Sequence, residues 1–166
     1  MSLALPGFEE CAAKGADIVL TPDDVAADVV RHFRPTGRIL DPCKGEGAFL
    51  RHMPGAEWCE IREGRDFFAW TKPVDWIVSN PPYSVFWEFM EHSFSVADNI
   101  VYAIPLAKLF HSGKRLRGLF DWGGIPGILI LGPGRNIGFP LGFAVAAVHM
   151  KRGYDGETRF SYPAND

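Results

Sequence analysis

The tetrapeptide Asn80-Pro81-Pro82-Tyr83 has the residue types and spacing that most clearly suit a chemical task. It follows an apolar run, residues 76–79, and its two prolines end any strand there and restrict the chain to extended geometry. Because Pro82 has no N–H group for a competing turn bond, the Pro81 carbonyl and the Asn80 side-chain oxygen can both accept protons from one NH2 group. This predicts a site that turns a planar amino group into a nucleophile, with Tyr83 able to stack on its ring.

A glycine-rich turn, Asp41-Pro42-Cys43-Lys44-Gly45-Glu46-Gly47-Ala48-Phe49, predicts a second binding element earlier in the chain. Ligands of open α/β sheets lie at the carboxyl ends of strands, and Gly45 and Gly47 would let the backbone approach one closely. A dinucleotide site would have a third glycine where this chain has Leu50, so a diphosphate is disfavoured. Asp41 would also repel phosphate but suits the positively charged S-adenosylmethionine. A purely structural turn is the alternative.

Two further acidic residues have positions that suit the rest of a nucleoside. Glu60 comes at the end of the strand predicted at residues 57–59, where a carboxylate can accept the protons of both ribose hydroxyls. Asp66 is placed to receive the amino group of an adenine. Surface ion pairs of these acids with Arg62 and Arg65 are the alternative interpretation.

Short apolar runs bounded by Gly, Pro and Asp must position these residues. Such runs predict the buried strands of a mostly parallel sheet at residues 38–40, 57–59, 76–79, 100–104 and 127–131. Helices are predicted from Thr21-Pro22, with the proline in the first turn, to about Pro35, and over residues 85–92. Residues 143–150 predict a strand that closes an antiparallel hairpin. The alternation predicts a doubly wound α/β fold.

Length and composition limit the remaining possibilities. A chain of 166 residues that is 47% hydrophobic and 22% charged predicts one domain over residues 1–166. It has no apolar stretch of about 18 residues and no leader pattern, which predicts a cytoplasmic protein without membrane contact. Cys11, Cys43 and Cys59 are odd in number and far apart, which predicts neither disulfides nor a metal site.

The net charge of −3 argues against non-specific binding of nucleic acid through the overall field of the protein. A local basic patch remains compatible with that charge, and a solvated helix face is the alternative interpretation of it. The patch consists of Lys108, Lys114, Arg115 and Arg117.

These motifs resemble those of the class I amino-methyltransferases, and most closely the N6-adenine DNA methyltransferases of bacteria and their phages. Residues 41–49 look like the cofactor motif of that family, and residues 80–83 are identified as its catalytic tetrapeptide. Thr21-Pro22 resembles the segment that contacts the methionine end of the cofactor, and residues 103–106 are similar to the strand-proline segment after the catalytic loop. The resemblance covers about residues 17–150.

The resemblance implies a Rossmann-like sheet of seven strands whose last strand is reversed. It implies S-adenosylmethionine as methyl donor, S-adenosylhomocysteine as product, no metal, and DNA as substrate with the target adenine flipped out against Tyr83. An aromatic residue late in the chain would cover the other face of the base. Phe139 is the first candidate and Phe143 the second, and core packing is the alternative for both.

Two features depart from the family pattern. Only 16 residues follow Met150, so no separate target-recognition domain is expected, and recognition would come from loops, a partner subunit or a homodimer. The acidic balance leaves few phosphate contacts, namely the basic patch with Arg135, Lys151 and Arg152.

Other functions remain open from the sequence. The same tetrapeptide occurs in enzymes that methylate a base amino group of ribosomal RNA or a glutamine amide in release factors, although the residues before Thr21 are few for the docking domain of the latter. A non-catalytic cofactor-binding module is a third possibility. A nicotinamide or flavin dehydrogenase is opposed by Leu50 and by the tetrapeptide.

Overall fold

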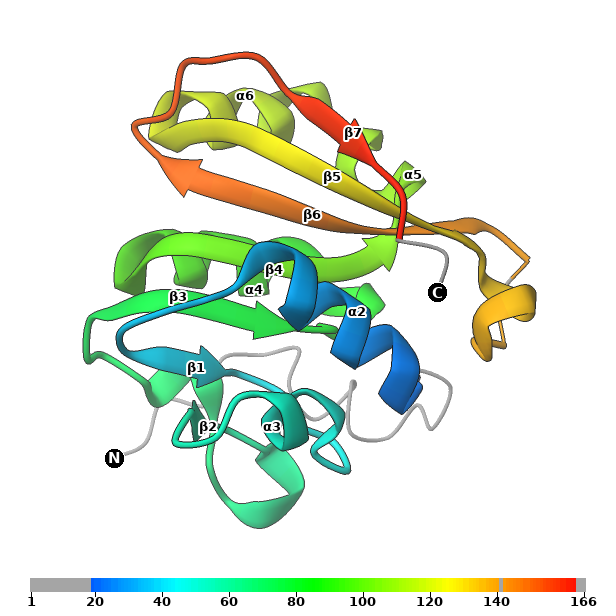
Figure 1. The fold of residues 1–166 in the computed structure, drawn as a ribbon. Coiled ribbons are helices and arrows are strands. Elements are labelled where there is room, and N and C mark those ends of the chain that lie inside the picture. The colour runs from blue at the N-terminus through cyan, green and yellow to red at the C-terminus, as the bar shows by residue number, and fades with distance from the viewer. Residues whose placement is uncertain (1–18, 141, 164–166) are drawn as a thin grey trace.

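The computed structural model describes residues 19–140 and 142–163. One seven-stranded sheet runs through this part of the chain, in the spatial order β2-β1-β3-β4-β6-β5-β7 (Figure 1). Its strands are β1 (Ile39–Asp41), β2 (Glu57–Trp58), β3 (Val74–Ser79), β4 (Ala97–Pro105), β5 (Gly123–Pro133), β6 (Ala144–Arg152) and β7 (Arg159–Ser161).

Helices cover both faces of the sheet. In Figure 1, α2 lies in front of the sheet and α4 behind it. Two buried apolar clusters match this division, because one contains residues of α4 and α6 and the other residues of α2 and α3. The α-helices are α2 (Asp23–Phe33), α3 (Ala48–His52), α4 (Phe86–Val96), α5 (Ala107–Phe110) and α6 (Gly113–Trp122). Short 3-10 helices are η1 (Ile61–Glu63), η2 (Phe67–Ala69), η3 (Tyr83–Val85) and η4 (Gly134–Ile137).

Helix α2 forms where the sequence predicts a helix. Val25 and Val29 face the core, and the acidic residues of the first turn favour the positive end of the helix dipole. Pro22 occupies the N-cap position, one residue before the first turn in which it was predicted. The helix ends at Phe33, and its C-cap residue, Arg34, has a left-handed φ of 48°, so the chain has already turned away before Pro35.

The strand directions confirm the predicted doubly wound α/β fold. β1, β2, β3 and β4 are parallel to one another, whereas β6 is antiparallel to both of its neighbours, β4 and β5. The predicted hairpin is therefore present, with Ile128 opposite Val148. The reversed strand is the last but one, because β7 follows it and runs parallel to β5. Three residues without an apolar run carry no strand signal, which is why β7 was not predicted.

The topology brings the two predicted motifs together. Strands β1 and β3 are parallel neighbours, with Leu40 opposite Ile77, so their carboxyl ends lie side by side. The glycine-rich turn leaves the end of β1 and the tetrapeptide leaves the end of β3. Within the described ranges, no helix is both long enough and apolar enough to cross a membrane.

Candidate active site

A buried acid and a buried hydroxyl join the ends of the two strands. The Ser79 hydroxyl donates a hydrogen bond of 2.6 Å to Oδ1 of Asp41, and both residues are fully buried. The backbone N–H of Cys43 donates to the same oxygen at 3.2 Å. The other carboxylate oxygen, Oδ2, is buried without a hydrogen-bond partner among the described residues. An acceptor in that state is costly unless a ligand satisfies it.

The electrostatics of Asp41 indicate what kind of ligand that would be. Burial raises the pKa of Asp41 to about 7, although the hydrogen bonds from Ser79 and Cys43 favour its ionised form, and the nearby charge of Glu60 adds to the rise. A positively charged group at Oδ2 would stabilise the carboxylate and offset the cost of burial. The end of β1 therefore fits a cationic ligand better than a phosphate.

The turn after β1 depends on its glycines. Gly45 and Gly47 have φ values of 53° and 82°, which side chains rarely adopt. The Gly47 N–H closes the turn by donating to the Lys44 carbonyl at 2.7 Å, and Gly47 then caps α3. Nothing lies within 4 Å of the place where a Cβ of Gly47 would be. The backbone there is open to close approach, as the predicted cofactor role requires; Pro42, which precedes it, is buried.

Glu60 is hydrogen-bonded to this same turn. It is 7% exposed, and its carboxylate accepts hydrogen bonds from the Gly45 N–H at 3.0 Å and from the Arg62 side chain at 2.9 Å. Burial opposes ionisation, but these bonds together hold the pKa of Glu60 below its usual value. The predicted alternative, an ion pair with Arg62, is present. The ribose contact stays a prediction, and it would have to compete with these donors.

Asp66 is partly buried, and its Oδ1 accepts the Phe68 N–H at 2.9 Å, so the side chain caps η2. Its predicted contact with an adenine amino group is left as a prediction. The other carboxylate oxygen is the one available for it.

The amide of Asn80 is held in one orientation. Its Nδ2 donates to the Val19 carbonyl at 3.0 Å and to the Thr21 hydroxyl at 3.1 Å. A carbonyl can only accept, so the contact with Val19 identifies which end of the amide is the nitrogen. The Asn80 oxygen, Oδ1, is buried, and no described residue donates to it. The arrangement presents a fixed acceptor with unused capacity.

Two of these contacts were not identified from the sequence. Thr21 was predicted to contact the cofactor, and the structure shows it holding Asn80. Val19 contributes a backbone carbonyl, which every residue possesses, so its residue type carries no signal. A polar residue directly before a helix start was the only available indication of the Thr21 contact.

The rest of the tetrapeptide continues into η3. Pro81 is buried, and Pro82 is extended, with φ −57° and ψ 128°. Tyr83 is half-buried and packs against the apolar cluster on the α4 side of the sheet. Its predicted stacking on a substrate ring stays a prediction.

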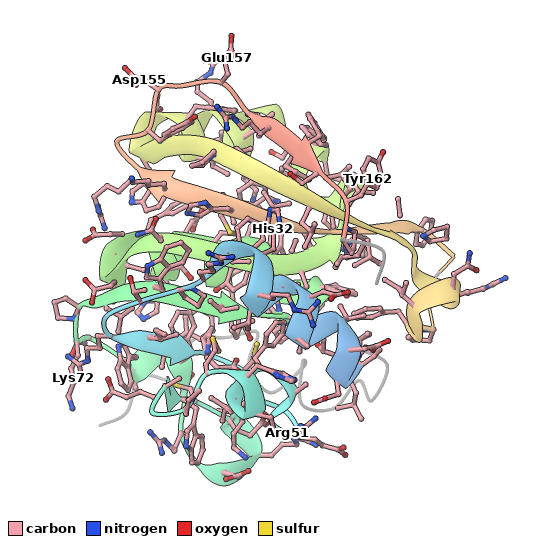
Figure 2. The ribbon with its side chains drawn as sticks, in the orientation of Figure 1. His32, Arg51, Lys72, Asp155, Glu157 and Tyr162 are labelled. Atoms are coloured by element: carbon pink, nitrogen blue, oxygen red, sulfur yellow. The ribbon has the colours of Figure 1, made fainter. Side chains whose placement is uncertain are left out.

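A pocket connects the three predicted motifs. It has a volume of about 410 Å³, including the solvent at its mouth. Arg51, which Figure 2 labels, belongs to α3 and lines the pocket. Its side chain donates a hydrogen bond of 2.7 Å to Asp23. The lining residues come from the segment before α2, from the glycine-rich turn with α3, and from the tetrapeptide: Val19, Leu20, Thr21, Cys43, Lys44, Gly45, Glu46, Ala48, Phe49, Arg51 and Asn80.

The late aromatic residues differ in exposure. Phe139 is 2% exposed and lies in the apolar cluster on the α2 side, as the core-packing alternative states. Stacking on a base would require it to leave that packing. Phe143 is 65% exposed and is the more accessible of the two candidates.

The basic patch lies on α5 and α6, outside the residues that line the pocket. Lys114, Arg115 and Arg117 are exposed, and Lys108 is partly buried. Arg115 is 3.8 Å from the Glu88 carboxylate, which leaves it only weakly neutralised. In the part of the chain that the structure describes, no group of three His, Cys, Asp or Glu residues could hold a metal ion.

No family model and no curated protein matches the sequence, but solved structures match the fold. A protein from Listeria monocytogenes, proposed to be a class I S-adenosylmethionine-dependent methyltransferase, has a TM-score of 0.63 at 14% identity over 88% of this chain and 66% of its own. The methyltransferase subunit of a type I restriction-modification system from Streptococcus thermophilus has a TM-score of 0.66 at 14% identity, over 87% of this chain and 47% of its own.

A proposed RNA methyltransferase from Pyrococcus horikoshii has a TM-score of 0.53 at 12% identity, over 78% of this chain and 82% of its own. The chain spans about two thirds of the Listeria protein and about half of the Streptococcus subunit. The fold is therefore that of the class I S-adenosylmethionine-dependent methyltransferases.

Proposed function

We propose that this chain transfers a methyl group from S-adenosylmethionine to the exocyclic amino group of adenine in DNA. The observation that carries the proposal is the Asn80 amide, whose nitrogen is held by Val19 and Thr21 while its buried oxygen has no donor among the described residues. Such an oxygen suits a substrate NH2 group, and it lines the same pocket as the glycine-rich turn.

The residues present fit the methyl donor. Gly45 and Gly47 leave the backbone open, and the Oδ2 oxygen of Asp41, to which no residue of the described ranges donates, suits a cation. Thr21, Glu60 and Asp66 are the further candidates for contact with it. When bound, S-adenosylmethionine supplies an activated methyl group on a positively charged sulfur.

The chain's own contribution is to prepare the amino group. An aromatic amine delocalises its lone pair into the ring and is a poor nucleophile in that state. When the Asn80 oxygen and the Pro81 carbonyl accept its two protons, electron density moves onto the nitrogen and its lone pair is oriented. Tyr83 would stack on the base, which must first leave the DNA duplex. No covalent intermediate with the protein and no metal is required.

The choice of adenine in DNA rests on the resemblance of the motifs and on the solved structures of similar fold. The Streptococcus structure is a subunit of a restriction-modification system, which supports a partner subunit, or a homodimer, as the source of target recognition. Lys108, Lys114, Arg115 and Arg117 would contact phosphates. The Pyrococcus structure keeps an RNA base as the second candidate substrate.

The test is incubation with labelled S-adenosylmethionine and unmethylated genomic DNA, total RNA and a cell protein extract side by side. Digestion of the labelled fraction then identifies the product. N6-methyladenine in DNA is the expected result. Label in RNA or in glutamine would keep the chemistry and replace the substrate, and cofactor binding without any label would favour a partner-dependent or non-catalytic module.

A further inference from the structure

The thiol of Cys43 lies between the two motifs of the pocket. Its Sγ is 3.0 Å from the Ser79 hydroxyl oxygen and 3.2 Å from the backbone carbonyl of Asn80, to which it donates. Ser79 in turn donates its single proton to Asp41. The four residues therefore form one continuous hydrogen-bonded chain from the end of β1 to the tetrapeptide.

We propose that Cys43 is a positioning residue that couples the Asn80 backbone to the buried Asp41–Ser79 pair, so that a cationic ligand at Asp41 adjusts the loop that holds the substrate. The proposal rests on the proposed function, because it assigns Asn80 to the substrate. It adds a link between the cofactor turn and the substrate loop, and by linkage the two ligands would then affect each other's binding.

The arrangement of protons explains the coupling. When Asp41 is ionised, Ser79 must donate to it, and the Ser79 oxygen can then accept the Cys43 proton, which competes with the Asn80 carbonyl. When the Oδ1 oxygen of Asp41 carries a proton, Asp41 can donate to Ser79, and Ser79 can donate to the sulfur. The Cys43 proton is then left to the Asn80 carbonyl alone. The strength of the bond at Asn80 therefore depends on the charge of Asp41.

Two titration properties support this role. The pKa of Asp41, raised to about 7 by burial, means that both of its charge states are accessible near neutral pH; Glu60 raises it further and Lys44 lowers it. Burial and the nearby Asp41 raise the pKa of the Cys43 thiol well above its usual value. The thiol therefore stays protonated and acts as a donor, not as a nucleophile.

The competing explanation is that Cys43 simply fills buried space. Cys59 provides a matched control, because it lies in the apolar cluster against which the partly buried Cys43 packs, is itself 2% exposed, and makes no side-chain hydrogen bond to a described residue. Replacing either thiol by alanine removes one sulfur. Only Cys43→Ala would also break the chain of hydrogen bonds.

The first experiment follows the S–H stretching band in the infrared. Subtracting the spectrum of Cys43→Ala isolates the Cys43 band, which reports the acceptor of its proton. We expect that band to shift when S-adenosylmethionine binds and when pH rises from 6 to 8. Ser79→Ala should abolish both shifts, and Cys59→Ala should leave them unchanged. Binding by calorimetry without any shift would overturn the proposal.

The pH titration needs no bound ligand, so it tests the coupling through Cys43 separately from the proposed methyl transfer. If the wild-type chain bound no S-adenosylmethionine, the proposed function would fail. The coupling through Cys43 would still be established if the Cys43 band changed with pH in the wild-type chain and not in Asp41→Asn. If the Cys43 band of the wild-type chain did not change with pH, the coupling through Cys43 would be refuted, whatever the methyltransferase activity.

The second experiment measures turnover and cofactor affinity separately. Loss of one hydrogen bond at the loop should lower kcat about five- to tenfold in Cys43→Ala, with the dissociation constant of S-adenosylmethionine within about threefold. Cys43→Ser, which keeps a donor, should recover most of kcat, and Cys59→Ala should match wild type. Equal turnover in the serine and alanine variants would contradict a positioning role.

Discussion

Buried polar groups are treated differently in two parts of the sheet. At the carboxyl ends of β1 and β3, Asp41 and Asn80 each keep one buried oxygen without a donor among the residues described. On β6, the partly buried His149 has its partners in place: its Nε2 is 3.0 Å from Asn99 Oδ1, and its ring stacks on Trp76 at a centroid distance of 5.0 Å. Acceptor oxygens without a donor therefore mark the ends of β1 and β3 as a ligand site, whereas the hydrogen-bonded imidazole on β6 serves stability.

The sharpest test of the comparison is Asn80→Ala set beside Asn99→Ala. Losing a well-placed acceptor in the transition state costs on the order of 3 kcal/mol, so Asn80→Ala should lower methyl transfer at least about a hundredfold. Affinity for S-adenosylmethionine should stay within a few-fold of wild type. Transfer of labelled methyl groups measures the first quantity and calorimetry the second.

Asn99→Ala is the matched control, since Asn99 is an amide that bonds His149 and the Asp75 carbonyl. It should lower stability and leave kcat nearly unchanged. Retained turnover in Asn80→Ala would show that Asn80 does not activate the substrate amino group.

The second prediction concerns stability in acid. Burial, aided by Lys151, lowers the pKa of His149 to about 4. Because the folded pKa lies below the unfolded value, the neutral ring contributes stability above about pH 6.5, and this contribution is lost as pH falls through 4. The loss of unfolding free energy should reach up to about 3 kcal/mol.

Urea unfolding at pH 7.5 and 4.5 measures this loss. His149→Gln, which keeps a donor for Asn99, should flatten the pH dependence. An unchanged slope in that variant would show that other groups control it.

The third prediction concerns Asp41→Asn. The pH dependence of the contribution of Asp41 to stability has the opposite sign to that of His149. The folded pKa of about 7 lies above the unfolded value, so the contribution of Asp41 to stability is present below about pH 3.8 and is lost as pH rises through 7. A cation binds the ionised form, so affinity for S-adenosylmethionine should rise between pH 6 and 8. Asp41→Asn should weaken binding about tenfold or more at pH 8 and much less at pH 6, because charged hydrogen bonds contribute about 1.5–3 kcal/mol. Calorimetry across this range decides the matter, and equal losses at both pH values would exclude Asp41 as the titrating group.

The smallest effect is expected for Thr21→Val. This change removes one of the two acceptors that hold the Asn80 nitrogen, and the Val19 carbonyl remains. A single neutral hydrogen bond contributes about 1 kcal/mol, so kcat should fall about fivefold. Thr21→Ser, which keeps the hydroxyl, should behave like wild type in the same kinetic assay. A larger effect on cofactor affinity than on kcat in the valine variant would favour the predicted cofactor contact over the Asn80 contact.

The parts that the sequence predicted are those with a repeated local signal. Apolar runs located β1, β3, β4 and β5, and the proline pair located the end of β3. The three-residue β7 has no such signal. The sequence predicted β6 as a strand that closes an antiparallel hairpin, and the resemblance to a family implied a reversed last strand. Neither predicted that β6 lies between β4 and β5.

The site was predicted less completely than the fold. Residue types marked Asp41 and Asn80, but the bond from Ser79 to Asp41 depends on how two strands are aligned, and the sequence does not encode that alignment in any short pattern. The orientation of the Asn80 amide depends on a backbone carbonyl. The roles of Glu60, Asp66, Tyr83 and the basic patch on α5 and α6 are still predictions.

The placement of β6 has a consequence for synthesis of the protein on the ribosome. β4 and β5 follow each other in the chain, yet both hydrogen-bond to β6, which begins only at Ala144. Until that strand has left the exit tunnel, the facing edges of β4 and β5 expose unpaired backbone groups beside some of the most apolar strands of the chain. The nascent chain is therefore most prone to aggregation just before β6 emerges, and a chaperone that acts at that stage would have the greatest effect on yield.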